Sequence, residues 1–198
     1  MKPFQPSSDI LQHHGVLGMK WGIRKDKRPS GGGQKSTIFV SGSSKTQSKD
    51  SEYYRKRLPK EIKGELKSHM KSGNKIVVGD APGIDRQVQG YLKKKHYKNV
   101  EVYGPGDKVR YSASKKWKTN PINASEFEKG SPEWLRKKDI AMTNVATEGL
   151  AVVLDEGAKA TRNNVKRLID QNKNVKVYEL SKKGSKYDKW VKAGKDFI

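Results

Sequence analysis

Short apolar runs alternate along the chain with segments of helical periodicity. Such runs are typical of buried strands, and the sequence predicts five of them, at residues 37–40, 76–78, 98–103, 149–154 and 174–180. The segments between them predict helices over 53–72 and 86–95, from Ser131 onward and after Gly157. In the first of these, apolar side chains recur every four residues from Leu58 to Met70, the spacing of one helix face.

This alternation predicts an α/β fold, a Rossmann-like and mainly parallel five-stranded sheet with helices on both faces. The expected domain spans residues 36–180, after a flexible N-terminal tail over 1–35 and before a basic C-terminal tail over 181–198. Residues 108–132 break the periodicity and are interpreted as an insertion or lid over the site. Their aromatic side chains would either stack on a base or anchor the loop to the core.

Three turns rich in glycine and small residues follow predicted strands and precede predicted helices, around Ser43, Gly83 and Gly157. In a parallel sheet such turns share the carboxyl edge of the strands, where α/β proteins bind ligands. A turn that leads into a helix leaves backbone N–H groups free for an anion such as a phosphate. Each turn alone could equally be a simple connection, so the predicted anion site rests on their convergence.

The net charge of the chain limits the kinds of binding partner to be expected. Lys and Arg number 43 against 21 Asp and Glu, a net charge of +22, which favours anionic ligands, although lysines spread along a chain also give an ordinary solvated surface. The absence of Cys excludes disulfides, thiolate metal sites and Cys nucleophiles. No apolar run reaches the length of a membrane span, so a soluble, intracellular or particle-borne protein without a membrane partner is expected.

The N-terminal tail carries a distinctive peptide, HHGVLGMKWGIRK, over residues 13–25. It resembles a short peptide found at the ends of tailed-phage head and morphogenesis proteins. The resemblance implies a phage-encoded protein of the host cytoplasm or the virion, with head or capsid proteins as partners of residues 13–25; virion association of a variant lacking residues 1–33 would test this. Metal binding by His13 and His14 is disfavoured because adjacent His without Cys makes a poor ligand set, and neither a metal nor a cofactor is expected.

The domain itself resembles the SLOG superfamily, in particular the YspA-like group related to DprA and the LOG phosphoribohydrolases. The resemblance rests on the Gly42–Ser44 turn, the stretch from Val77 to Asp85, the Arg136-x-x-Asp139-x-x-Met142 helix and the Asp155-x-Gly157-x-Lys159-x-Thr161 turn. It covers Ile38 to Tyr178 and implies a Rossmann-like fold with a nucleotide-derived ligand.

Carried over residue by residue, the resemblance implies a ligand site made of Gly42, Ser43, Ser44, Gly79, Asp80, Gly83, Asp85, Arg136, Asp155, Gly157, Lys159 and Thr161. The first turn would contact a phosphate or ribose, Asp85 would meet sugar hydroxyls or hold its turn, and Lys159 and Thr161 would meet a phosphate. Two positions depart from the family pattern, since Ser44 replaces an Arg and Ala160 replaces a Gly. The PGGxGTxxE motif of the LOG enzymes is absent.

Three functions remain open from the sequence. The first is a protein that binds a nucleotide or nucleotide-derived signal, which in a phage could sequester a host defence signal. The second is hydrolysis of an N-glycosidic or phosphate bond, for which Asp85, Asp155 and Glu156 are the acids available, with Asp85 as the candidate catalytic residue. The third is DprA-like binding of nucleic acid through the basic surface. The oligomeric state is left open.

Overall fold

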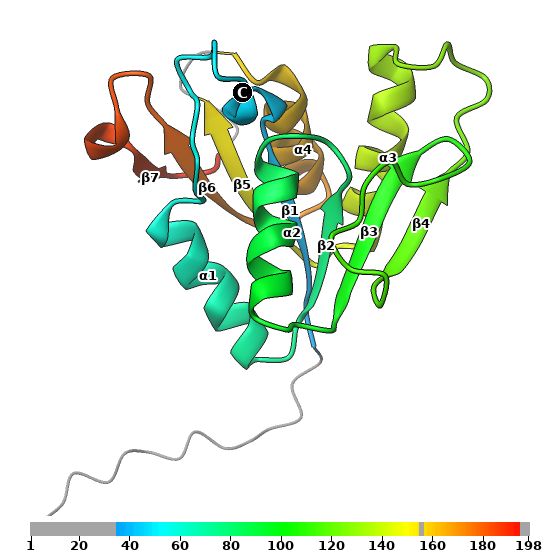
Figure 1. Cartoon of the computed structure of the whole chain (residues 1–198), viewed down its shortest axis with the longest axis horizontal. Helices are drawn as coiled ribbons and strands as arrows, with labels where there is room; N and C mark the ends of the chain where they lie inside the picture. The colour runs from blue at the N-terminus through cyan, green and yellow to red at the C-terminus, as the bar shows by residue number, and fades with distance from the viewer. Residues whose placement is uncertain (1–34, 155–156, 195–198) are drawn as a thin grey trace, which may run out of the picture. The chain divides into compact units, whose positions relative to one another are not determined.

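A seven-stranded sheet forms the centre of the protein in the computed structural model, which describes residues 35–154 and 157–194. Its strands follow the order β4-β3-β2-β1-β5-β6-β7 (Figure 1). Their bounds are Thr37–Gly42 for β1, Lys75–Gly79 for β2, Val100–Pro105 for β3, Lys118–Ile122 for β4, Glu148–Leu154 for β5, Asn174–Leu180 for β6 and Lys189–Val191 for β7. Every neighbouring pair is parallel except β6 and β7. The predicted α/β fold with a mainly parallel sheet is confirmed.

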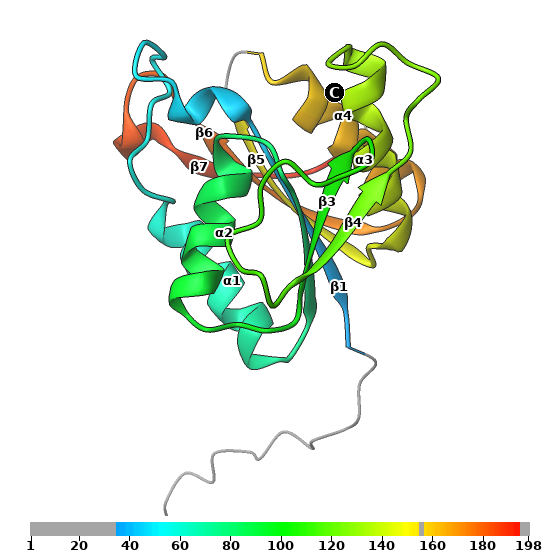
Figure 2. The same ribbon diagram turned by 45° about the vertical axis from the view of Figure 1, so that its right-hand side comes forward.

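In the described part of the chain, four helices cover the sheet, two on each face. Figures 1 and 2 show the helices and the sheet from two directions. The helices are α1 (Lys60–Lys71), α2 (Ile84–Lys94), α3 (Pro132–Val145) and α4 (Lys159–Asp170), and short 3-10 turns occur at Ser44–Gln47 and Ser185–Tyr187. Helices α1 and α2 lie on one face, and α3 and α4 lie on the other. Among the described residues, no helix has both the length and the apolar character needed to cross a bilayer.

Side chains alternate between the two faces along each strand, so one sheet contributes to a hydrophobic core on each face. Ile38 and Val40 of β1 pack with apolar side chains of α1 and α2, whereas Phe39 between them packs with Met142 of α3 and Leu168 of α4. Successive strand side chains point to opposite faces, so a strand buried on both sides must be apolar at every position. This is why the central strands appear in the sequence as unbroken apolar runs.

The helix boundaries follow local chemistry. Helix α3 begins as its sequence predicts, because Ser131 accepts a hydrogen bond from the Trp134 amide at 3.1 Å and Pro132 occupies the first turn. Helix α1 begins at Lys60, seven residues later than predicted. Pro59 precedes it with φ −52°, and residues 48–58 form turns instead of helix.

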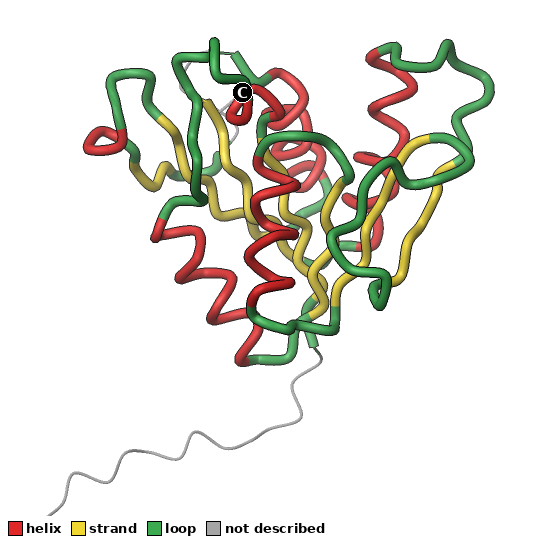
Figure 3. Tube along the Cα trace, viewed as in Figure 1, coloured by secondary structure: helices red, strands yellow, loops and turns green. Residues whose placement is uncertain are grey.

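Two edge strands extend the sheet beyond the five that the sequence predicts. β4 lies inside the segment interpreted as an insertion, and β7 lies inside the expected C-terminal tail, where it pairs with β6. The loop before β4, which Figure 3 shows beside the sheet, is anchored rather than free. Trp117 is buried and its indole N–H donates to the Tyr97 carbonyl at 2.9 Å. Two interpretations were given for the aromatic side chains of this loop, and for Trp117 the structure confirms the second one, anchoring to the core.

Candidate functional site

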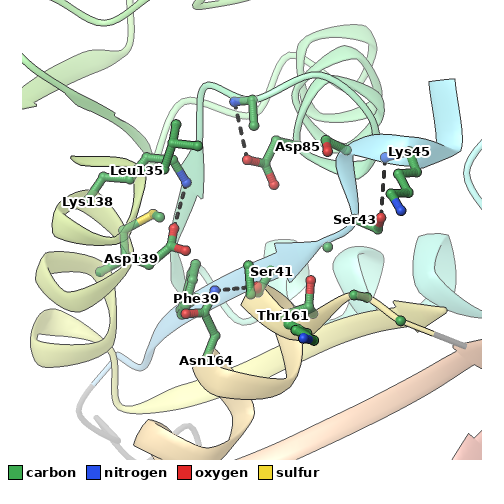
Figure 4. Close-up of a pocket in the computed structure, with 18 residues that line it drawn as sticks. Phe39, Ser41, Ser43, Lys45, Asp85, Leu135, Lys138, Asp139, Thr161 and Asn164 are labelled. Carbon is green, nitrogen blue, oxygen red and sulfur yellow. Dashed lines mark hydrogen bonds and ion pairs between the residues drawn. The ribbon is translucent and has the colours of Figure 1, made fainter. Parts of the chain in front are cut away.

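The strand order reverses between β1 and β5, and a cavity of about 440 Å³ opens at the carboxyl ends of these strands (Figure 4). This is where doubly wound sheets bind their ligands. The cavity is enclosed by the loops after β1 and β2, the inner face of α3 and the first turn of α4. The predicted site residues that line it are Gly42, Ser43, Ser44, Asp85, Gly157, Lys159 and Thr161.

Two glycines let the loops after β1 and β2 interlock beside this cavity. Gly83 has φ +87°, and a Cβ there would lie 2.2 Å from the Ser43 carbonyl oxygen. The next amide, of Ile84, donates to that same oxygen at 3.1 Å. A Cβ on Gly42 would lie 2.4 Å from the Ile84 side chain. Gly83 has to be glycine because the two loops approach each other at backbone distance, and Gly42 because the branched Ile84 side chain lies directly against it.

The floor of the cavity holds a buried cluster of charged groups, Asp85, Lys138 and Asp139, which are 4%, 6% and 8% exposed. Lys138 donates to the Asp139 carboxylate at 2.6 Å. Asp85 accepts a 3.3 Å hydrogen bond from the Ala81 amide. Gly79 makes room for the cluster, since a Cβ there would lie 2.3 Å from Asp85 Oδ2 and 2.9 Å from Lys138 Nζ.

This burial changes the acidity of the cluster. Desolvation raises the pKa of Asp85 to about 7, opposed by the Lys138 ammonium and reinforced by Asp139. Desolvation alone would lower the pKa of Lys138, but the surrounding carboxylates outweigh it and raise that pKa above its ordinary value. Lys138 is therefore a fixed positive charge, whereas Asp85 exchanges a proton near neutrality.

Substitution of Asp85 by asparagine is expected to flatten the pH dependence of stability. Because the pKa is 3.8 for an ordinary Asp and about 7 in the fold, the native state binds a proton that the unfolded chain releases between these values. The contribution of this group is complete below pH 4 and is lost as the pH rises through 7, a change of about 4 kcal/mol. Urea unfolding of the wild type and Asp85→Asn from pH 4.5 to 8.5 measures this, and parallel profiles would contradict it.

The first turn of α4 forms the opposite wall. Its N-cap, Ala158, has φ +57° and makes no side-chain cap, and the first turn has no acidic residue. The helix amides therefore meet the cavity together with the positive end of the helix dipole, and Lys159 adds a charge at the mouth. Thr161 is 3% exposed, and its hydroxyl points toward the cavity (Figure 4) without a hydrogen-bond partner among the described residues.

A series of hydrogen-bonded polar side chains supports this wall. Asn164 of α4 donates to the Ser41 hydroxyl of β1 at 2.8 Å and accepts from Arg167. Ser41 and Asn164 are both buried and both line the cavity. This bond ties α4 to β1 across the switch point, so the helix N-terminus is held at a fixed height above the strand.

The remaining predicted site residues lie elsewhere. Gly79 and Gly83 do not line the cavity. Gly79 makes room for the buried charged cluster, and Gly83 allows the loops after β1 and β2 to approach each other. Asp80 is buried and both of its oxygens accept from Arg110, including a 2.9 Å bond from the Arg110 amide, so it fastens the loop before β4. No residue of that insertion lines the cavity, so among the described residues it is not a lid. Arg136 lines a neighbouring groove between α3 and α4, and Asp155 and Glu156 lie outside the described residues.

Sequence reasoning missed the role of Lys138 and Asp139 at the floor, and of Ser41 and Asn164 below α4. In this stretch of α3 a ligand role was predicted for Arg136, Asp139 was used only as part of a family motif, and Lys138 was given no role. The overlooked signal is spacing, because Trp134, Lys138 and Met142 recur every four residues and therefore share the buried face of α3. Among the described residues, no group of three or more His, Asp or Glu side chains could hold a metal ion.

Comparison with known proteins adds one finding. A family profile described as a family of unknown function (DUF7211) matches residues 5–28. Among curated proteins, none matches the chain significantly. The matched stretch includes the peptide at residues 13–25, lies outside the described residues and covers a small part of the chain. The SLOG resemblance of the domain and the phage resemblance of the peptide both stay predictions.

Proposed function

We propose that this protein binds a nucleotide or a nucleotide-derived signal in the switch-point cavity. The observation that carries the proposal is the hydroxyl of Thr161, which has no hydrogen-bond partner among the described residues and faces a cavity beside a helix N-terminus. A ligand oxygen in the cavity can make the hydrogen bond that the protein itself does not make to this hydroxyl.

The two ends of the cavity favour different parts of such a ligand. Lys45 and Lys159 stand at the mouth with the α4 amides, which suits a phosphate. Asp85 and Asp139 stand at the floor, where carboxyl oxygens suit ribose hydroxyls or a base amine. A volume of about 440 Å³ is within the range of small-molecule sites. The SLOG resemblance agrees with this ligand class, and the phage-type peptide supports a signal of host defence as the ligand.

Substitution of Thr161 by valine is expected to weaken ligand binding about tenfold, the equivalent of one hydrogen bond, while leaving stability unchanged or slightly higher. The two effects differ because valine keeps the shape of the side chain and removes a hydroxyl that makes no hydrogen bond to the described part of the protein. Calorimetry against nucleoside monophosphates, cyclic nucleotides, cyclic dinucleotides and ADP-ribose measures the first effect, and urea unfolding measures the second.

The matched control is Lys166→Ala, which changes an exposed residue of the same helix outside the cavity. Its binding should equal that of the wild type. The proposal fails if no member of the panel binds, or if both variants lose the same affinity.

Hydrolysis of an N-glycosidic bond is the second candidate, and Asp85 is the observation that favours it. A carboxyl group with a pKa of about 7 at a cavity floor can exchange a proton at neutral pH. Product analysis of the same panel separates the two functions. Turnover by the wild type that Asp85→Asn abolishes without loss of binding supports the enzyme, and binding without turnover supports the signal-binding protein.

A further inference from the structure

The outer face of α2 carries two grooves that meet on the helix. The first, of about 580 Å³, lies between α2 and the segment that leads into α1, and the second, of about 820 Å³, lies between the end of α2 and the loop before β4. Both include Gly90 and Lys94, so they form one continuous surface, here called the α2 surface. Figure 1 shows α2 at the front of the molecule between these two segments.

The α2 surface is cationic throughout. Its charged residues are Lys56, Arg57, Lys63, Lys93, Lys94, Lys95, Lys98 and Lys116, accompanied by His96. No Asp or Glu lines either groove, and within the described part of the chain none of these eight cations forms an ion pair. Elsewhere on the described domain, some Lys and Arg side chains are paired with carboxylates and others are not. Such a gathering of unpaired charges is repulsive in the free protein and is relieved by a polyanion.

We propose that the α2 surface binds the phosphate backbone of nucleic acid without sequence specificity. The floor of the surface explains the lack of specificity. Trp117 is buried with its indole N–H donated to the Tyr97 carbonyl, and the Tyr91 hydroxyl donates to the Lys63 carbonyl at 3.3 Å, so neither polar group is free to read a base edge. Gly90 removes a side chain from the ridge between the grooves, and a Cβ there would meet no atom within 4 Å, which lets a backbone approach the helix closely.

An anionic membrane is disfavoured by the apolar side chains. The exposed large hydrophobic residues of the described chain are Phe127, Ile140, Val145, Tyr187 and Trp190, and none lines the α2 surface. Peripheral membrane binding usually combines basic charge with inserted apolar groups. Backbone binding of nucleic acid needs only positive charges that neutralise phosphates, and its affinity falls steeply with salt.

The test reverses three charges from three segments in the full chain, with the variant Lys56→Glu, Lys94→Glu, Lys116→Glu. Fluorescence anisotropy with a labelled 20-nucleotide single strand and a 20-base-pair duplex is expected to show at least tenfold weaker binding at low salt. The slope of log affinity against log salt should fall by about 2 for the single strand and about 3 for the duplex, because three phosphate contacts are lost. The oligonucleotide whose affinity falls more, the single strand or the duplex, is the form of nucleic acid that the α2 surface prefers.

The control variant, Lys49→Glu, Lys129→Glu, Lys166→Glu, changes net charge equally at exposed positions outside both grooves. It should bind within about threefold of the wild type, and both variants should unfold at the wild-type urea midpoint. Equal loss in both variants, or no binding at low salt, overturns the proposal. Tighter binding to vesicles containing phosphatidylserine than to either oligonucleotide, abolished by the first variant, assigns the surface to a membrane and overturns it as well.

Discussion

Replacement of Gly83 by alanine is expected to destabilise the protein by about 3 kcal/mol or more. The residue has φ +87°, where a Cβ costs about 1–2 kcal/mol by itself, and the new atom would lie 2.2 Å from the Ser43 carbonyl oxygen. The clash is with backbone, so no side-chain rotation relieves it. Either the loops after β1 and β2 separate, which breaks the hydrogen bond from Ile84 to Ser43, or the strain remains in the fold. Urea unfolding with linear extrapolation measures the loss.

Gly64→Ala is the matched control for this substitution. Gly64 lies inside α1, and a Cβ there would meet no atom within 4 Å. Alanine is the better helix former, so this variant is expected to gain about 0.5–1 kcal/mol. If Gly83→Ala lowers the free energy of unfolding while Gly64→Ala raises it, the contact between the loops after β1 and β2 is the cause of the destabilisation. A Gly83→Ala variant as stable as the wild type would mean that the wall of the cavity is adjustable.

Replacement of Lys138 by methionine is expected to cost about 3–5 kcal/mol of stability at pH 7.5. The substitution keeps the length of the side chain but leaves the buried carboxylate of Asp139 without its 2.6 Å partner. It also removes the positive charge that opposes protonation of Asp85, so Asp85 should hold its proton to a higher pH. Urea unfolding at several pH values reports both effects.

Two controls separate burial from charge in this experiment. Lys137→Met changes the preceding residue of α3, whose ion pair with Glu126 is partly exposed, and should cost less than 1 kcal/mol. The double variant Lys138→Met, Asp139→Leu removes both buried charges and should recover most of the stability lost in the single variant. If the double variant is as unstable as the single one, packing and not the ion pair determines the cost.

The fold was predictable because its central strands are buried on both faces and therefore apolar at every position. The edge strands have no such constraint. β4 reads Lys-Thr-Asn-Pro-Ile and is mostly exposed, and β7 has only three residues, so neither produces a hydrophobic signal. The position of β4 beside β3 is decided by tertiary contacts of the preceding loop, in particular Arg110 with Asp80, which no local pattern encodes.

The sequence predicted the rim of the candidate site and, at its floor, Asp85. Turns with glycine and small residues mark where strands end, and those at Ser43 and Gly157 line the cavity. The rest of the floor was not predicted because Lys138 and Asp139 are charged, and charged residues on a helix are normally solvent-exposed. Their burial depends on how α3 lies across β1, β2 and β3, which is a property of the assembled domain and not of the helix.

The two edges of the sheet have a consequence for the protein at high concentration. Pro121 in β4 has no N–H to offer, and the other edge ends in a three-residue strand whose Lys189 lies beside Glu179. Neither edge presents a long row of free backbone groups to another copy. The domain should therefore resist aggregation through strand addition, even where the cell or a particle confines many copies together.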